Sequence, residues 1–300
     1  MSSAFAPAHI TGFFDVTEPS SNPLYQGSRG AGICIENGVT THVRLERSSR
    51  TNMVVKVNGS QSNSAIVSET VSKMMLTKSE SDYTVLINHQ IDVPIGSGYG
   101  SSGSAALSLA YALNDALDLD LSKMEAAQIA HLAEIECGTG LGTVLAEYHG
   151  GAEIRRSAGA PGFGNVSRFK VGKRNIVGSV SFGLLSTRTC LANRELIANI
   201  NLHGAASLNA LLREPSSDIF MKLARKFAIA LGILPERLLN LIESTRSAGI
   251  TSSMSMFGKT LFSLISEDEK SDLERIFGYN NESRAKLLFS RIDERGARLL

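Results

Sequence analysis

The residue types most suited to chemistry gather in one run, PIGSGYGSSGSAA, at residues 94–106. A backbone with so few Cβ atoms can approach an anion closely, and successive N–H groups at the start of a helix form a positive concavity. Serine hydroxyls can add hydrogen bonds to a phosphate or bind Mg²⁺, a hard cation that prefers oxygen ligands. A mostly apolar, helix-forming stretch follows directly, which is unusual for a flexible Gly/Ser linker. The run therefore predicts a phosphate loop, whose residues expected to contact nucleotide are Pro94, Gly96, Ser97, Gly98, Tyr99, Gly100, Ser101, Ser102, Gly103 and Ser104.

Two carboxylates stand just before a second glycine-rich turn. Glu134 and Glu136 end an expected helix over residues 121–137, and the turn at 138–143 reads GTGLGT. Residues two apart on a helix point in different directions, so at most one of the two faces a site. A solvated carboxylate at the helix end is the competing interpretation, because glutamate is usually exposed.

A segment near the C-terminal end resembles part of another nucleotide-binding motif. Residues 257–260, Phe-Gly-Lys-Thr, imitate the end of a Walker-type P-loop, but the position of its first glycine is occupied by Ser253. Residues 261–265 are apolar and strand-like where a P-loop requires a helix. A Walker-type nucleotide site is therefore not expected there.

The elements that must position these residues follow from the apolar spacing. Short β segments are expected at 30–35, 40–45 and 52–58, with a hairpin turn where residues 36–38 read Glu-Asn-Gly. Further strands are expected at 83–90, 148–154 and 176–182, and helices at 66–75, 104–117, 121–137, 190–212, 219–230, 235–244 and from 267 onward. This is an α+β layout without regular βαβ repeats, and a polar break near 165–175 suggests a domain boundary.

Composition and charge narrow the class of protein. A chain of 300 residues with 43% hydrophobic and 20% charged residues is expected to be globular, with one large or two packed domains. Its 30 basic and 29 acidic residues nearly cancel, which disfavours binding to nucleic acid or to an anionic membrane. The three scattered cysteines form no CxxC pair, and no apolar run is long enough to cross a bilayer, so a cytoplasmic location is expected.

The phosphate loop resembles the signature of the GHMP kinases, Pro-x3-Gly-Leu-Gly-Ser-Ser-Ala-Ala. Pro94, Gly98, Gly100, Ser101 and Ser102 are in step with it, whereas tyrosine at 99 replaces the usual leucine and Gly-Ser at 103–104 replaces the first alanine. Residues 6–14, APAHITGFF, look like the N-terminal substrate-side strand of the family, and residues 253–260 look like its C-terminal glycine-rich segment. Three matches in the family's order cover nearly the whole chain.

This resemblance implies a fold, a nucleotide and a metal. The expected GHMP kinase fold has a ribosomal-protein-S5-like N-terminal domain, here residues 1–168, and a ferredoxin-like C-terminal domain, here 169–300. ATP is the expected phosphate donor in the cleft between them, with Mg²⁺ held by Ser102 and Glu134. Thr143 occupies the catalytic position that carries an aspartate in many family members, and threonine cannot serve as a general base near neutral pH. In-line transfer without a carboxylate base is therefore favoured, with Asp15 as a weak substitute.

Within the family, the segments AHITGFF at 8–14, GSRGAG at 27–32 and TGLG at 139–142 look most like the archaeal pantoate kinases. That likeness implies an anionic hydroxy acid as substrate, for which arginine offers a planar fork that fits a carboxylate. The residues expected to bind it are His9, Thr11, Arg29 and Arg155, with Arg156 as the alternative to Arg155.

Three alternatives stay open at this point. The substrate could be another small alcohol, such as homoserine, mevalonate or shikimate. The protein could be a catalytically silent metabolite sensor, an idea kept open by Thr143. An RNA-binding role is disfavoured by the near-zero net charge. The expected partner is a small-molecule substrate, and a homodimer is a further option.

Overall fold

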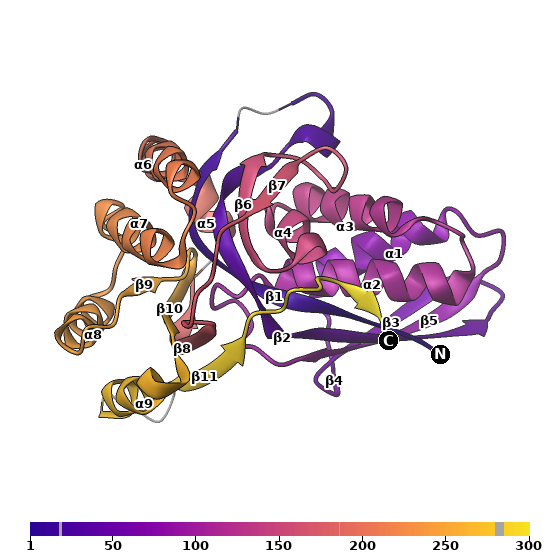
Figure 1. Ribbon diagram of the computed structural model, residues 1–300. Helices are drawn as coiled ribbons and strands as arrows, with labels where there is room; N and C mark the ends of the chain where they lie inside the picture. The colour runs from indigo at the N-terminus through magenta and orange to yellow at the C-terminus, as the bar shows by residue number, and fades with distance from the viewer. Residues whose placement is uncertain (18–19, 186, 280–284) are drawn as a thin grey trace.

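The structure, a computed structural model, describes residues 1–17, 20–185, 187–279 and 285–300. It contains two β-sheets with helices packed on them (Figure 1). The α+β class that the apolar spacing predicts is confirmed.

The first sheet carries the phosphate loop. Its strand order is β12-β1-β2-β5-β3-β4, with β6 and β7 extending from β2, and every pair except β3 with β5 is antiparallel. Helices α1 (Ile66–Leu76), α2 (Ser101–Leu117) and α3 (Lys123–Cys137) gather on one side of this sheet (Figure 1). The strands are β1 (Ser2–Val16), β2 (Ser28–Arg47), β3 (Asn52–Val57), β4 (Ser60–Gln61), β5 (Tyr83–Ile91), β6 (Ala152–Ser157), β7 (Asn165–Arg168) and β12 (Arg298–Leu299).

Two predictions in this half are wrong. The expected hairpin at 36–38 lies inside the single strand β2, where the register against β1 shifts between Pro7 and Ala8. Pro7 of β1 has no N–H to donate to β2, and the extra residues of β2 opposite it form a bulge. The strand therefore continues past residues 36–38 and does not turn back. The expected strand at 148–154 begins only at Ala152, because Thr143–His149 form a short helix, α4. Seven residues between glycines are too few for helical spacing to stand out.

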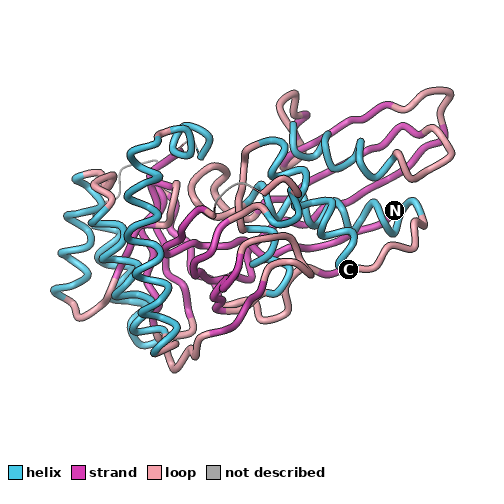
Figure 2. Tube along the Cα trace, turned by 90° about the horizontal axis from the view of Figure 1, so that it is seen from above, coloured by secondary structure: helices cyan, strands magenta, loops and turns pink. Residues whose placement is uncertain are grey.

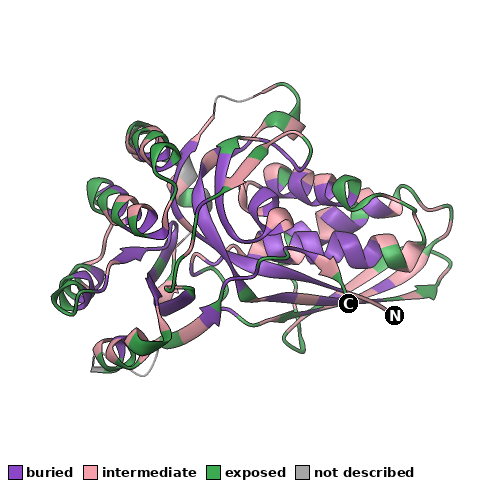
Figure 3. Ribbon diagram, in the orientation of Figure 1, coloured by how far each residue is buried: buried purple, intermediate pink, exposed green. Residues whose placement is uncertain are grey.

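The second sheet has four antiparallel strands in the order β11-β8-β10-β9. Its helices pack side by side at one end of the molecule (Figure 2), with exposed outer faces and buried inner faces (Figure 3). The expected helix at 190–212 is divided at Asn193, whose side chain accepts the backbone N–H of Leu196 and so caps the second part. The elements are β8 (Ile176–Leu184), β9 (Ser252–Met254), β10 (Gly258–Ile265), β11 (Lys286–Arg291), α5 (Thr187–Ala192), α6 (Arg194–Arg213), α7 (Ser217–Ala230), α8 (Glu236–Ser247), α9 (Lys270–Tyr279) and the 3₁₀ turns η1 (Pro23–Tyr25) and η2 (Glu267–Glu269).

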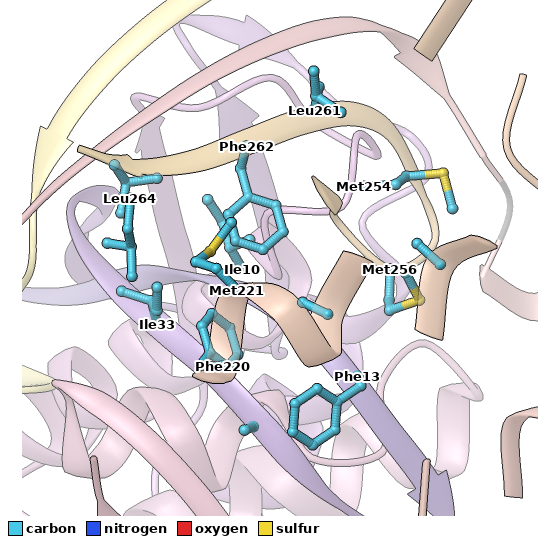
Figure 4. Close-up of a cluster of buried hydrophobic side chains, with 14 of the residues drawn as sticks. Ile10, Phe13, Ile33, Phe220, Met221, Met254, Met256, Leu261, Phe262 and Leu264 are labelled. Carbon is cyan, nitrogen blue, oxygen red and sulfur yellow. The ribbon is translucent and has the colours of Figure 1, made fainter. Parts of the chain in front are cut away.

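One hydrophobic core joins the two sheets. Phe13 of β1 packs against Phe220 of α7, with ring centroids 6.0 Å apart, and Phe220 stacks on Phe169 at 4.8 Å. Figure 4 shows Ile10 and Ile33 of the first sheet beside Phe262 and other side chains of the second half. The division into residues 1–168 and 169–300 stays a prediction. The sheets change near that point, but residues 298–299 return to pair with β1.

Candidate active site

A cavity of about 140 Å³ opens where the phosphate loop meets β1 and the glycine-rich turn before α4. Its walls come from both halves of the chain, since Met256 and Phe257 of the second half face the loop. The residues that line it are His9, Thr11, Phe14, Ser28, Gly96, Gly98, Tyr99, Gly100, Ser101, Ser102, Gly103, Glu134, Thr139, Gly140, Leu141, Gly142, Thr143, Arg155, Met256 and Phe257.

The phosphate loop ends in an uncapped helix. Gly100 precedes α2 in a left-handed conformation, with φ of 64°, and no side chain caps the helix. The first N–H groups of a helix have no acceptor within it and carry the positive end of its dipole, so this terminus suits an anion. Of the residues expected to contact nucleotide, seven line the cavity, whereas Pro94, Ser97 and Ser104 do not.

The second half fixes the backbone of the loop. The carbonyl of Ser97 accepts the Thr260 hydroxyl at 2.7 Å, and that of Gly98 accepts the Ser255 hydroxyl at 2.5 Å. The Tyr99 hydroxyl lies 2.8 Å from that of Ser179 on β8, so tyrosine at this position adds a third polar link. Burial raises the pKa of Tyr99 to about 12, so the phenol stays neutral.

Glu134 and Ser102 meet inside the cavity. The Ser102 hydroxyl donates to Glu134 Oε1 at 2.5 Å, and the Thr139 hydroxyl donates to the same oxygen at 2.7 Å. Glu134 is buried, whereas Glu136 is exposed, so the two carboxylates do point in different directions. Burial raises the pKa of Glu134, and the two hydroxyl donors oppose that rise.

These oxygen donors fit Mg²⁺. The ion usually takes one or two protein carboxylates and completes its shell with phosphate oxygens and water. Within the described residues there is no group of three or more His, Cys, Asp or Glu side chains that could hold a metal by itself. A site with one carboxylate and one hydroxyl beside an anion-binding helix terminus matches that pattern.

Behind the loop lies a second buried carboxylate, Glu147 of α4. Its Oε1 accepts the Ser104 hydroxyl at 2.9 Å, while no described residue hydrogen-bonds Oε2. Burial raises the pKa of Glu147 well above its usual range, and the charge of Glu134 adds to the rise. Ser104 thus faces the protein interior and helps to fix the start of α2.

A charged cluster forms the opposite wall. Arg155 is only 1% exposed, and its guanidinium pairs with Glu153 two residues earlier on β6. Arg155 Nε has no hydrogen-bond partner among the described residues. His9 Nε2 lies 2.9 Å from Glu153 Oε1, and His9 Nδ1 lies 3.2 Å from the Thr11 hydroxyl. His9, Thr11 and Arg155, all expected to bind substrate, are therefore brought together at the cavity.

Other expected residues lie elsewhere. Arg29 and Asp15 form a two-bond ion pair, with Arg29 Nε 3.0 Å from Asp15 Oδ1, and neither lines the cavity. The pKa of Arg29 is raised by that hydrogen bond. Arg156 is exposed on the other face of β6. Thr143 does line the cavity, at the start of α4.

Sequence reasoning did not single out Glu147 or Glu153. A signal for Glu153 was available, because residues two apart on a strand share a face and Arg155 was already a candidate. Glu147 had no such signal, since no helix was expected over residues 143–149 and the expected strand began one residue after it, at 148.

None of the helices in the described part of the chain is both long and apolar enough to span a membrane.

Known proteins agree with this architecture. The family model described as the GHMP kinases N terminal domain matches residues 65–151. A pantoate kinase of Methanocaldococcus jannaschii is 36% identical over 89% of this chain and 94% of its own length, and one of Thermococcus kodakarensis is 33% identical over 93% and 92%. A solved phosphotransferase related to the CoA biosynthesis pathway is 30% identical, covers 99% of this chain and 98% of its own, and superposes with a TM-score of 0.91.

A homoserine kinase structure from Cytophaga hutchinsonii shares the fold, with a TM-score of 0.71 at 17% identity over 100% of this chain and 97% of its own. Because relatives more than 30% identical align over most of both chains and the phosphate loop lies inside the matched domain, this chain belongs to the GHMP kinase family and, within it, resembles the archaeal pantoate kinases.

Proposed function

We propose that this ATP-dependent small-molecule kinase phosphorylates the hydroxymethyl oxygen of pantoate, giving 4-phosphopantoate on the route to coenzyme A. The observation that carries the proposal is Arg155, a cation buried in the wall of the cavity whose Nε has no partner among the residues that the structure describes. A buried guanidinium is costly unless an anion pairs with it. Glu153 supplies one carboxylate, and the carboxylate of a hydroxy acid would supply the second.

The phosphate side of the reaction lies across the same cavity. The N–H groups at the start of α2 would bind the triphosphate, and Ser102 with Glu134 would hold Mg²⁺. When bound, Mg²⁺ supplies positive charge to the transferring phosphoryl group. The links from Ser255 and Thr260 keep the loop carbonyls turned toward the second half. Catalysis then depends mainly on holding the two reactants in line.

A substrate panel tests this proposal directly. Purified protein with ATP and Mg²⁺ is offered pantoate, homoserine, mevalonate, shikimate and galactose, and ADP release is followed. We expect pantoate alone to stimulate release well above background. Turnover of homoserine or mevalonate with none of pantoate would overturn the substrate but leave the kinase fold intact. ATP binding without turnover of any alcohol would favour the silent sensor.

The role of Arg155 is tested by charge. Arg155→Met keeps an aliphatic side chain of similar length and removes the positive charge. The KM for pantoate should therefore rise at least tenfold, which corresponds to the loss of one charge-assisted hydrogen bond. The primary amide of pantoate keeps the hydroxymethyl group and lacks the charge. It should be a poor substrate of the wild type, and Arg155→Met should discriminate little between acid and amide.

The cytoplasmic location, the homodimer and the absence of nucleic-acid binding stay predictions. Light scattering of the purified protein tests whether it is a homodimer. An RNA shift assay at several salt concentrations tests whether it binds nucleic acid.

A further inference from the structure

The cavity lacks the aspartate that the family resemblance would place at residue 143, where this chain has threonine. A proton must nevertheless leave the substrate hydroxyl during transfer. Four titratable side chains line the cavity: His9, Tyr99, Glu134 and Arg155. Arg155 has no acceptor, Glu134 is assigned with Ser102 to Mg²⁺, and the Tyr99 hydroxyl is bonded to Ser179. His9 is left as the candidate base.

The backbone and the ring of His9 are both held in place next to the phosphate loop. Its backbone N–H donates to the carbonyl of Tyr99 at 2.9 Å, so the residue is tied to the loop itself. Its ring occupies space that glycine at 32 leaves open, since a Cβ there would lie 2.3 Å from His9 Nε2. Thr11, two residues along β1, shares the face of His9, is half-buried and lines the cavity.

The hydrogen bonds define the tautomer of His9. An ionised carboxylate only accepts, so Nε2 must carry the hydrogen that it donates to Glu153 Oε1 at 2.9 Å. The guanidinium of Arg155 also lies 3.4 Å from this nitrogen, but its bond to Glu153 is much shorter, so we assign the hydrogen on Nε2 from the contact with the carboxylate. The Nδ1 atom is then an acceptor and takes the Thr11 hydroxyl hydrogen at 3.2 Å. The Thr11 oxygen consequently offers its lone pairs to a hydroxyl in the cavity.

We propose that Glu153, His9 and Thr11 form a relay that removes the proton of the substrate hydroxyl. The inference rests on the proposed function, because it requires an alcohol acceptor in the cavity. As the substrate oxygen bonds to the γ-phosphorus, its proton passes to Thr11 Oγ1 and the Thr11 proton passes to His9 Nδ1. The bond from the γ-phosphorus to the β,γ-bridging oxygen breaks, and its electron pair leaves with ADP. Glu153 stabilises the imidazolium, which returns its proton to solvent after release.

The surrounding charges suit a base that is neutral at rest. Burial lowers the pKa of His9, and Arg155 lowers it further, whereas the hydrogen bond and charge of Glu153 raise it. Glu147 of α4 lies behind the loop: its Oε1 and the His9 carbonyl oxygen would be 2.8 Å and 3.3 Å from a Cβ on Gly100. The ring is therefore unprotonated near neutral pH, ready to accept a proton, and its carboxylate partner is in place for the charged state.

Two conservative substitutions test the relay in the full-length protein. His9→Gln keeps a donor to Glu153 but has no base, and Thr11→Val keeps the shape of threonine without its hydroxyl. Each should lower kcat roughly a hundredfold, the lower range for general-base catalysis. The KM for the alcohol and the Kd for ATP by calorimetry should change less than about threefold. Thr11→Ser should restore most of the activity.

The pH profile separates a base from a structural histidine. The wild-type kcat should fall on the acid side, below about pH 6.5 because burial lowers the pKa of His9. His9→Gln should lack that fall. The matched control is His42→Gln, which removes an imidazole bonded to the Ser3 hydroxyl at 2.7 Å, on the same pair of strands and outside the cavity. It should keep both the wild-type kcat and the acid fall.

Nitrogen NMR of the resting protein gives a readout independent of turnover. The His9 resonances, assigned by their loss in His9→Gln, should show a hydrogen on Nε2 and none on Nδ1. A hydrogen on Nδ1 would overturn the relay, as would a kcat for His9→Gln within about threefold of wild type. A raised KM with unchanged kcat would assign His9 to positioning Arg155 and also overturn it. Failure of the proposed function looks different, because the wild type itself would then turn over no pantoate. The variants would be assayed with whichever alcohol of the panel is phosphorylated, and wild type inactive on all of them would overturn the relay as well.

Discussion

Replacing Gly258 by alanine would place a methyl group inside the backbone of the phosphate loop. A Cβ at this position would lie 1.9 Å from the carbonyl oxygen of Ser97, 2.2 Å from its carbonyl carbon and 2.6 Å from the nitrogen of Gly98. Real Cβ atoms essentially never approach closer than 3.0 Å, so strand β10 and the loop must separate by about 1.1 Å. The hydrogen bond from Thr260 to Ser97, now 2.7 Å, would be lost by such a shift.

A loop displaced by about 1 Å no longer aligns the phosphates with the acceptor, and misplacement of that size can cost about a hundredfold in rate. We therefore expect kcat/KM for ATP to fall about a hundredfold in Gly258→Ala. Overpacking should also lower the free energy of unfolding by about 1–3 kcal/mol. ADP release and ATP calorimetry measure the first effect, and urea unfolding measures the second.

Gly278→Ala is the matched control, because a Cβ on this glycine of helix α9 would meet no atom of the described residues within 4 Å. It should leave kcat/KM unchanged and stabilise the helix slightly. If Gly258→Ala stays folded and keeps kcat/KM within about threefold of wild type, the idea that the second half fixes the loop is refuted.

Two further outcomes are expected. Ser102→Ala and Glu134→Gln should each lower kcat roughly a hundredfold and increase the Mg²⁺ requirement, and the double variant should be little worse because both changes affect one ion; near wild-type activity of Glu134→Gln would contradict the assignment. Burial lowers the pKa of His89 to about 4, so the unfolded chain binds a proton more readily and stability falls as the pH drops below about 6.5. His89→Gln has no imidazole to protonate, so its stability should not fall with pH in this way. Urea unfolding should show the wild type more stable than His89→Gln by a margin that shrinks by about 2–3 kcal/mol between about pH 7.5 and 4.5. A margin that stays constant would argue against a low pKa for His89.

The sequence was most informative where function depends on neighbours along the chain. The phosphate loop and the helix after it are contiguous, so glycine spacing and apolar spacing together predicted both. The pairing of Ser102 with Glu134 came from the family resemblance, and the structure brings the two side chains to 2.5 Å. The angle between residues two apart on a helix predicted that at most one of Glu134 and Glu136 faces the site, and the choice of Glu134 came from the family resemblance.

The rest depended on contacts between distant residues. Arg29 looks like a substrate ligand among small residues, yet its Nε and Nη2 atoms bond Asp15 on the adjacent strand and the side chain lies outside the cavity. Glu-Asn-Gly has the local chemistry of a turn, but pairing with β1 on both sides of a bulge keeps these residues within one strand. The position of Glu153 between His9 and Arg155 depends on the register of two strands, which a sequence alone does not specify.

The two ends of the chain lie side by side (Figure 1). Arg298 and Leu299 pair with Phe5 and Ala4 on the outer edge of β1, and the Leu300 N–H donates to Ser3 at 2.9 Å. A ribosome makes β1 long before residues 298–300, which cover its edge, so a nascent chain carries an open strand edge while the residues between them are made. Open edges invite pairing with other chains. The edge of β1 is therefore covered only after residues 298–300 have been made, and a chain that lacks them would leave that edge open to pairing with other chains.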